Sequence, residues 1–450
     1  MKSKKILAAA ILSVAASGLS FSGNAQTTTT TTVYIAGADH SSYGSTTQKT
    51  CGLPKYWTIV NGGAPSRQYL SQNMGTADEP VTGYGCSFGV TSDGSYVYNT
   101  GFLQSDLNTY SVGEAWTGTG IPAPLTDGSN GARGEAILHL GGVTYVAGYE
   151  NIDPRSKVYK MNHAAGVAKS RALFTNESVE SSGTESIATL WVGNSPQYLS
   201  QHTPSAAQGI LYYNNTIYIS GYDTDSEDGY TYATVWTYTP ATKKLSSFRL
   251  SPKAKKGAKA TDSVNYVVTS GIAGYGSTIY ITGYQPTTSG STTTASTAYY
   301  WSCVSGSSPL TCTSHSLPGY TTNNAYANGV AFDGNGNMAI VGYDTSTASG
   351  NPYKAVYWKK NSSGTMTEYQ FNTPAKSYAQ AIVYGGSSST TPYVSMYGIN
   401  INSSAQSGFF QPGYWSTLDE STAPTVLDTT VVGANDYAYG IYSITTTSAK

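Results

Sequence analysis

Seven tryptophans recur along the chain, and each follows a glycine that ends a β-rich run. The tryptophans are Trp57, Trp116, Trp191, Trp236, Trp301, Trp358 and Trp415. The glycines are Gly37, Gly101, Gly148, Gly221, Gly283, Gly342 and Gly398, and most of them precede an aromatic residue. This one-to-one match along 450 residues indicates an internal repeat, which constrains the fold more than any other feature of the sequence.

A third marker completes the repeat. A small residue followed by Ile or Val precedes six of the glycines, at Gly89, Ala136, Gly209, Gly271, Gly329 and Ala381. The spacing suits one strand, a tight turn and a return strand. With the Trp strand and a short fourth strand, each unit has four strands, which is typical of a propeller blade. The sequence therefore predicts an all-β, seven-bladed β-propeller, whose small residues let seven innermost strands converge on one axis.

The first repeat lacks its innermost strand, and the missing copy lies near the C-terminus at Gly440-Ile441. We expect the C-terminal strand to complete the first blade, because closure hides the sheet edges of an open ring. The boundaries that follow are a signal peptide at 1–25, a Thr-rich flexible segment at 26–32, the propeller at 33–444 and a flexible tail at 445–450.

The repeat resembles that of bacterial extracellular HAF-repeat proteins. These have a Gly-Ile strand, a Val-Gly-Tyr-like strand and a third strand of the form Ala-aromatic-Leu-Trp. The best match lies between Tyr326 and Phe371, with Gly329-Val330, Val341-Gly342-Tyr343 and Ala355-Val356-Tyr357-Trp358. The resemblance implies an exported propeller without a known catalytic set.

The N-terminus and the composition predict export. Three lysines precede an apolar run from Ile6 to Ser20, and Gly23-Asn24-Ala25 provides small residues for cleavage. Only 11% of residues are charged, and loss of the three lysines changes the formal net charge from −1 to −4. We expect a monomeric protein that is secreted or periplasmic, with no transmembrane segment and no affinity for nucleic acid.

Four cysteines fit an oxidising compartment. Cys303 and Cys312 are close enough to join one hairpin, which leaves Cys51 to pair with Cys86. Four cysteines permit three pairings, and buried free thiols are the alternative.

Polar residues lie two positions after six of the marker glycines, at Asp39, Glu150, Asp223, Gln285, Asp344 and Asn400. In a propeller these positions lie where the second strand enters its connection to the third. Their oxygen atoms are candidates for a ring that binds a cation or sugar hydroxyls. The alternative is that they cap turns by bonding to nearby backbone.

The fourth repeat contains a run of alternating carboxylates followed by Gly229. The carboxylates are Asp223, Asp225, Glu227 and Asp228. Calcium prefers six to eight oxygen ligands supplied by closely spaced residues. The run is therefore a candidate calcium site, and calcium is the one cofactor that the sequence suggests. The alternative is a solvated acidic loop.

Two long basic connections lie on the same predicted face. One contains Arg155 and Lys157, and the other contains Lys255 and Lys256. Long connections in compact domains are either functional or unstructured. These residues are candidate contacts to an anionic partner.

The sequence thus favours a non-catalytic binding or adhesion module that recognises a glycan or an extracellular protein through one face. The alternative is an extracellular lyase or hydrolase of polysaccharides or small molecules with a site at the central mouth. A structural surface protein is a third class. No pair of the five histidines has the spacing of metal ligands.

Overall fold

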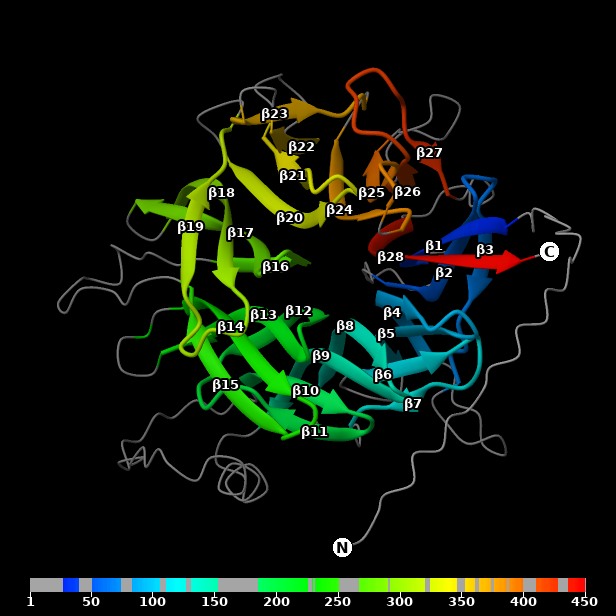
Figure 1. Cartoon of the computed structure of the whole chain (residues 1–450). Helices are drawn as coiled ribbons and strands as arrows, with labels where there is room; N and C mark the ends of the chain where they lie inside the picture. Colours follow the sequence, from blue (N-terminus) through cyan, green and yellow to red (C-terminus); the bar gives the residue numbers. More distant parts are fainter. Residues whose placement is uncertain are drawn as a thin grey trace, which may run out of the picture.

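Seven four-stranded antiparallel sheets stand around a common axis in the computed structural model of the chain (Figure 1). The structure describes residues 27–39, 51–73, 83–105, 111–126, 131–152, 185–225, 229, 231–250, 267–289, 292–319, 324–345, 353–360, 364–373, 376–386, 388–399, 410–427 and 436–449. The predicted seven-bladed propeller is confirmed.

We number the blades along the chain, and each has four strands from the axis outwards. The innermost strands of blades 1 to 7 are β28 (Asp436–Ala449), β4 (Gly83–Ser92), β8 (Ala132–Leu140), β12 (Ser205–Tyr213), β16 (Val267–Tyr275), β20 (Ala325–Phe332) and β24 (Ser377–Tyr384). The second strands are β1 (Thr27–Asp39), β5 (Val97–Ser105), β9 (Val143–Ile152), β13 (Thr216–Thr224), β17 (Thr278–Ser289), β21 (Met338–Asp344) and β25 (Pro392–Ile399). The third strands are β2 (Leu53–Val60), β6 (Val112–Thr117), β10 (Glu185–Val192), β14 (Thr231–Thr239), β18 (Thr292–Val304), β22 (Lys354–Lys360) and β26 (Phe410–Trp415). The outermost strands are β3 (Ser66–Tyr69), β7 (Ala123–Pro124), β11 (Ser195–Tyr198), β15 (Lys244–Arg249), β19 (Cys312–Ser316), β23 (Met366–Gln370) and β27 (Thr425–Val426).

The seven tryptophans form the centre of the hydrophobic packing between blades. Each of them is at most 1% exposed. A Cβ atom added at Gly37 would lie 2.6 Å from the Trp57 ring, and one at Gly221 would lie 2.8 Å from Trp236. The marker glycine therefore leaves the space that the tryptophan ring occupies.

The small residues of the innermost strands bring neighbouring blades into backbone contact. A Cβ atom at Gly440 would lie 2.2 Å from the Phe88 carbonyl oxygen of the next blade. A Cβ atom at Gly271 would lie 2.8 Å from the Cα atom of Gly329, whose own added Cβ would lie 2.9 Å from the Cα atom of Ala381. Larger side chains at these positions would push the blades apart. Small residues were predicted here for this reason, because they let the innermost strands converge on one axis.

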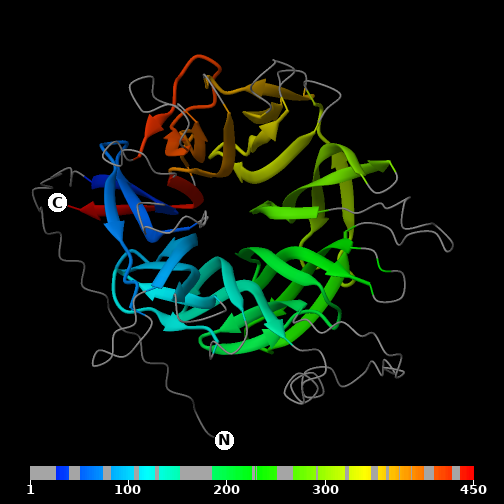
Figure 2. The ribbon, with the colours of Figure 1, turned by 180° about the vertical axis from the view of Figure 1, so that it is seen from behind.

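The first and last strands of the chain close the ring. β28 pairs with β1, and the two lie side by side in both views (Figures 1 and 2). The ladder runs from Asp39 opposite Asp436 to Thr27 opposite Ala449. This corrects the expected flexible segments, since 27–32 and 445–449 belong to paired strands. Threonine is β-branched and favours strands, so the Thr-rich ends extend the ladder.

Blade 7 departs from the predicted register by two residues. Its innermost strand places Ala379 opposite Met396, whereas blade 6 places Ala327 opposite the marker glycine Gly342. Met396 is therefore the counterpart of Gly342, and Gly398 takes the place that Asp344 has in blade 6. The sequence marker at Gly398 was wrong by this shift.

Both predicted disulfides are present, as Cys51–Cys86 and Cys303–Cys312. The first joins blade 1 to blade 2, and the second joins the third and fourth strands of blade 5. Disulfides persist in oxidising compartments, so the pair indicates an extracytoplasmic location. Among the described residues, no helix has the length and apolar character needed to cross a membrane.

Candidate functional site

A β-bulge interrupts the innermost strand of every blade at the same level, next to the small-residue motif. In blades 1, 2, 3, 4, 6 and 7 the bulge adds Tyr439, Phe88, Glu135, Gln208, Asn328 and Gln380. A bulge re-aims a side chain and is common beside binding sites. Six of the blades thereby present one extra side chain each at this level of the innermost strand.

Aromatic residues surround these bulges where the innermost strand begins and the second strand ends. In blade 6, Tyr326 lies opposite Tyr343, and in blade 7 Tyr378 lies opposite Tyr397. The ring centroids are 4.5 Å apart in the first pair and 5.1 Å apart in the second. These distances are typical of favourable aromatic contacts.

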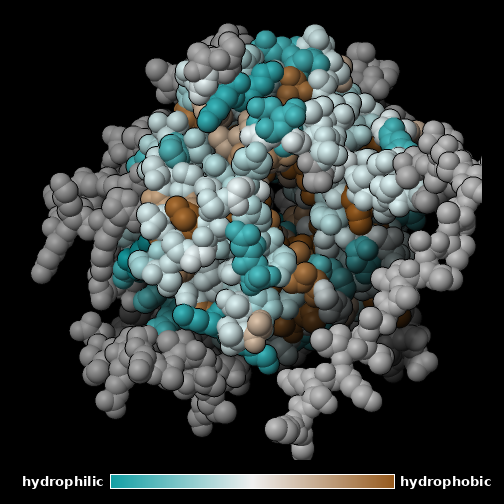
Figure 3. All heavy atoms as spheres, viewed as in Figure 1, coloured by the Kyte–Doolittle hydropathy of each residue, from teal (hydrophilic) through white to brown (hydrophobic). Residues whose placement is uncertain are grey.

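Rings of neighbouring blades also contact one another. The centroid distances are 4.6 Å for Tyr284 and Tyr326, 4.9 Å for Tyr343 and Tyr378, 5.1 Å for Tyr397 and Tyr437, and 5.0 Å for Tyr439 and Phe88. With Phe102, which stacks on Phe88 at 5.9 Å, these residues form a continuous series from blade 5 through blades 6, 7 and 1 to blade 2. We call this series the tyrosine collar. The space-filling view shows that the molecule is hollowed near the middle of the ring (Figure 3).

The collar tyrosines with raised pKa values are uncharged over the physiological pH range. Burial and the neighbouring tyrosines raise the pKa values of Tyr343, Tyr378 and Tyr439 well above the ordinary value, and they raise that of Tyr397 to about 12. Most of these side chains are only half-buried. The collar therefore offers neutral ring faces together with hydroxyl groups.

Charged groups lie at two places along the collar. The Arg133 guanidinium lies 3.7 Å from the centroid of Phe88, and its Nε atom lies 2.6 Å from Glu135 Oε1. Burial raises the pKa of Glu135, although the charge of Arg133 opposes this effect. The Lys376 amine lies 5.2 Å from the Tyr353 centroid and 5.7 Å from that of Tyr378.

Three of the predicted ring residues, Glu150, Asp223 and Asp344, lie in well-defined surroundings. Glu150 accepts a hydrogen bond of 3.3 Å from the Tyr198 hydroxyl. Asp223 accepts one from the Ser200 hydroxyl, and burial raises its pKa. Asp344 is 2% exposed. These carboxylates are thus embedded in or between blades, and their role in binding stays a prediction.

The structure describes less of the surroundings of the other three predicted ring residues. Gln285 is half-buried at the second strand of blade 5. Asp39 ends β1, and its side chain is not described, while Asn400 lies outside the described residues. In blade 7 the position that Asp344 has in blade 6 is occupied by Gly398.

The candidate calcium loop is described in part. Asp225 is buried and forms an ion pair with Arg249, with 2.6 Å between Oδ2 and Nη2. Glu227 and Asp228 lie outside the described residues. Within the described part of the chain, no group of three or more His, Cys, Asp or Glu residues is arranged to hold a metal ion.

The basic residues of the two long connections, Arg155, Lys157, Lys255 and Lys256, also lie outside the described residues. Their expected contact with an anionic partner stays a prediction.

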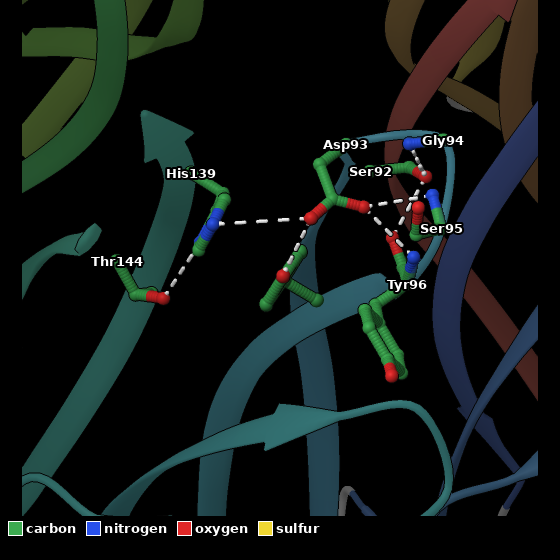
Figure 4. Close-up of polar contacts among 8 residues, drawn as sticks. Ser92, Asp93, Gly94, Ser95, Tyr96, His139 and Thr144 are labelled. Carbon is green, nitrogen blue, oxygen red and sulfur yellow. Dashed lines mark hydrogen bonds and ion pairs between the residues drawn. The ribbon is translucent and has the colours of Figure 1, made fainter. Parts of the chain in front are cut away.

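A polar cluster on the face opposite the tyrosine collar joins blades 2 and 3 (Figure 4). Asp93 accepts hydrogen bonds from the Tyr98 hydroxyl and from the backbone N–H groups of Ser95 and Tyr96, each of 2.8 Å. The bond from Tyr96, followed by that from Tyr98, lowers the pKa of Asp93. His139 stacks on Tyr98 with centroids 4.0 Å apart, and its Nε2 atom lies 3.9 Å from Asp93 Oδ2. The cluster satisfies its own polar groups and fixes the turn against the next blade.

Comparison with known proteins gives remote similarities. No family model matches the sequence, and no curated protein matches it. A Fusarium graminearum α-L-arabinofuranosidase in complex with an iminosugar inhibitor is 9% identical, with a TM-score of 0.40, over 70% of this chain and 88% of that one.

Two further structures are similar at the same level. A Trypanosoma rangeli sialidase mutant displaying trans-sialidase activity is 10% identical, with a TM-score of 0.37, over 69% of this chain and 51% of that one. A puromycin-hydrolysing peptidase of Mycobacterium tuberculosis is 10% identical, with a TM-score of 0.35, over 66% of this chain and 37% of that one. Such similarity concerns the fold alone and assigns no activity.

Proposed function

We propose that the protein is an exported, non-catalytic binding or adhesion module that recognises a glycan through the tyrosine collar. The observation that carries the proposal is the unbroken series of ring contacts from Tyr284 in blade 5 to Phe102 in blade 2. The sequence expectation of a glycan or an extracellular protein is thereby narrowed to a glycan.

The chemistry of the collar supports this choice. One face of a pyranose ring carries C–H groups, which pack well against the face of an aromatic side chain. Sugar hydroxyls require hydrogen-bonding partners, which the tyrosine hydroxyls provide. Ligand sites commonly combine aromatic walls with a few polar groups in this way.

Export rests on the predicted signal peptide at 1–25, together with the two disulfides. The resemblance to HAF-repeat proteins supports the same location. We propose that the protein belongs with the HAF-repeat proteins, and this proposal rests on the strand pattern of blade 6 alone.

A glycan array probed with the mature protein tests the proposal. The variants Tyr378→Leu and Tyr397→Leu keep most of the side-chain volume and remove the ring face and the hydroxyl group. We expect wild-type protein to bind a defined set of glycans and both variants to lose at least about tenfold in affinity, a loss of about 1.4 kcal/mol. Tyr96→Leu, in the exposed turn of the opposite face, is the matched control and should bind as the wild type does.

One outcome of the array experiment would contradict the proposal. Binding that is unchanged in both collar variants, with melting temperatures equal to that of the wild type, would exclude the collar as the glycan site.

Glu135 supports a second candidate, an enzyme with its site at the central mouth. A carboxyl group whose pKa is raised by burial is suited to act as a general acid. Glycoside hydrolysis ordinarily needs two carboxyl groups about 5–9.5 Å apart. The variant Glu135→Gln separates the candidates, because it would abolish turnover of a bound glycan and leave binding by a non-catalytic collar largely unchanged.

A further inference from the structure

Six blades have a tyrosine at the same position of the second strand. In blades 1 to 5 this tyrosine pairs with the residue that follows the tryptophan. In blade 7 it is the residue before Val394, which pairs with Trp415. These residues are Tyr34, Tyr98, Tyr145, Tyr218, Tyr280 and Tyr393. They lie towards the face opposite the collar, where in blades 2, 3, 4, 5 and 7 the first strand turns into the second.

Several of these tyrosines reach into the following blade. Tyr98 stacks on His139, and the Tyr280 and Phe332 centroids are 4.7 Å apart. The Tyr218 hydroxyl accepts a 3.0 Å hydrogen bond from the backbone N–H of Gly306. The repeated tyrosine therefore fills the space between two blades.

Blade 6 breaks the repeat at this position twice. Ala339 occupies the place of the tyrosine, and the residue across the ladder from it is Lys359. The counterparts of Lys359 in blades 1 to 5 are small or medium-sized, namely Thr58, Thr117, Val192, Thr237 and Ser302. One blade thus exchanges a large ring for a methyl group and gains a lysine beside it.

A pocket of about 850 Å³ opens at this break, around the end of blade 6. Its lining includes Ala339, Lys359, Lys360, Tyr384, His315 and Thr417. The pocket between blades 2 and 3, where the tyrosine is present as Tyr98, measures about 370 Å³. The larger volume is that of a small-molecule site.

The charge of the pocket favours an anion. Its carboxylate, Asp333, accepts hydrogen bonds from the N–H groups of Asn335 and Asn337 and from the Asn337 side chain, all within its own turn. Lys360 is exposed, and the Lys359 amine lies 3.4 Å from the Leu418 carbonyl oxygen. The pocket lining thus contains two lysines and one carboxylate, and that carboxylate is already hydrogen-bonded within its own turn.

The remaining lining suits a sugar ring. Hydroxyl groups come from Ser302, Tyr384, Thr390 and Thr417, while Tyr275 and Phe332 stack at 4.9 Å at the edge. A six-membered ring can occupy the space that the missing tyrosine leaves, with its hydroxyls bonded to these groups. From the break in the repeat, the pocket and the lysine pair, we propose a second binding site, for a hexuronic acid residue of an acidic saccharide. This site is separate from the collar and does not depend on it.

Isothermal titration of the full mature protein with digalacturonic acid tests the site. The variant Ala339→Tyr restores the residue that six blades carry, so it fills the pocket with a side chain that the fold accepts. Lys359→Thr restores the residue of blades 1, 2 and 4 and removes one positive charge. We expect each variant to weaken digalacturonic acid binding by at least about tenfold. Lys244→Thr, on the exposed outer strand of blade 4, is the control and should leave binding unchanged.

The outcomes separate this site from the collar. Loss of binding in both pocket variants but not in Tyr378→Leu supports the second site. The proposal is overturned if the wild type does not bind digalacturonic acid, or if the pocket variants bind it as the wild type does. It is also overturned if 4-hydroxybenzoate binds and digalacturonic acid does not, since the pocket would then take an aromatic acid. Should Ala339→Tyr fail to fold, Lys359→Thr alone decides.

Discussion

Lys55 and Asp436 form a buried ion pair that joins the first blade's third strand to the strand that closes the ring, with 3.1 Å between Nζ and Oδ2. The two side chains are 0% and 4% exposed. The Lys55 amine also lies 4.9 Å from the centroid of Trp57. Residues from the two ends of the chain therefore meet inside the blade that both ends build.

Removal of one partner of this pair should destabilise the ring strongly. Lys55→Met or Asp436→Asn leaves a buried charge without its opposite, which typically costs about 3–5 kcal/mol of unfolding free energy. The double variant Lys55→Met/Asp436→Asn should cost less than the sum of the two single variants. Denaturant unfolding measures all three, and additive losses would show that the two groups do not interact.

The two disulfides should differ in their contribution. They enclose separations of 35 and 9 residues, so the chain-entropy model gives about 4 kcal/mol for Cys51–Cys86 and about 3 kcal/mol for Cys303–Cys312. Unfolding of Cys51→Ala/Cys86→Ala and of Cys303→Ala/Cys312→Ala measures this. A larger loss from the hairpin disulfide would contradict the view that the bond between blades 1 and 2 matters more.

Glu114 in β6 should make the protein less stable as the pH rises. It is 2% exposed, and burial raises its pKa to about 8. The unfolded chain releases this proton near its ordinary pKa of about 4.3, so stability falls between about pH 4.3 and pH 8.

Glu114→Gln should therefore increase the unfolding free energy at pH 8 by about 1–3 kcal/mol and change it little at pH 4. Exposed Glu420→Gln is the control. Equal effects of Glu114→Gln at the two pH values would contradict a raised pKa.

The fold was predictable because marker glycines occur where neighbouring atoms leave no room for a side chain. Gly37 and Gly221 leave room for Trp57 and Trp236, so both partners of each contact are visible in the sequence. The register of blade 7 was not predictable, since Met396 replaces the glycine and Gly398 lies two residues away.

The two proposed binding surfaces were predictable only in part. The aromatic residue after five of the seven marker glycines is visible in the sequence, but contacts such as those of Tyr343 with Tyr326 and of Tyr397 with Tyr378 arise only through the strand pairing. The bulge that adds Glu135 or Asn328 leaves no sequence signal of its own. Alignment of the second strands on the marker glycines shows tyrosine three residues before five of them and Ala339 three residues before Gly342. The sixth tyrosine, Tyr393, is found only from the strand pairing of blade 7.

Hydroxyl-radical footprinting with a neutral oligosaccharide selected on the glycan array tests the role of the collar most directly. Mass spectrometry would compare the oxidation of each tyrosine with and without the oligosaccharide. The collar account predicts protection of Tyr326, Tyr378, Tyr397 and Tyr437, and unchanged oxidation of Tyr96 on the opposite face. Protection confined to Tyr96 and its neighbours, with the four collar tyrosines oxidised as in the free protein, would contradict it.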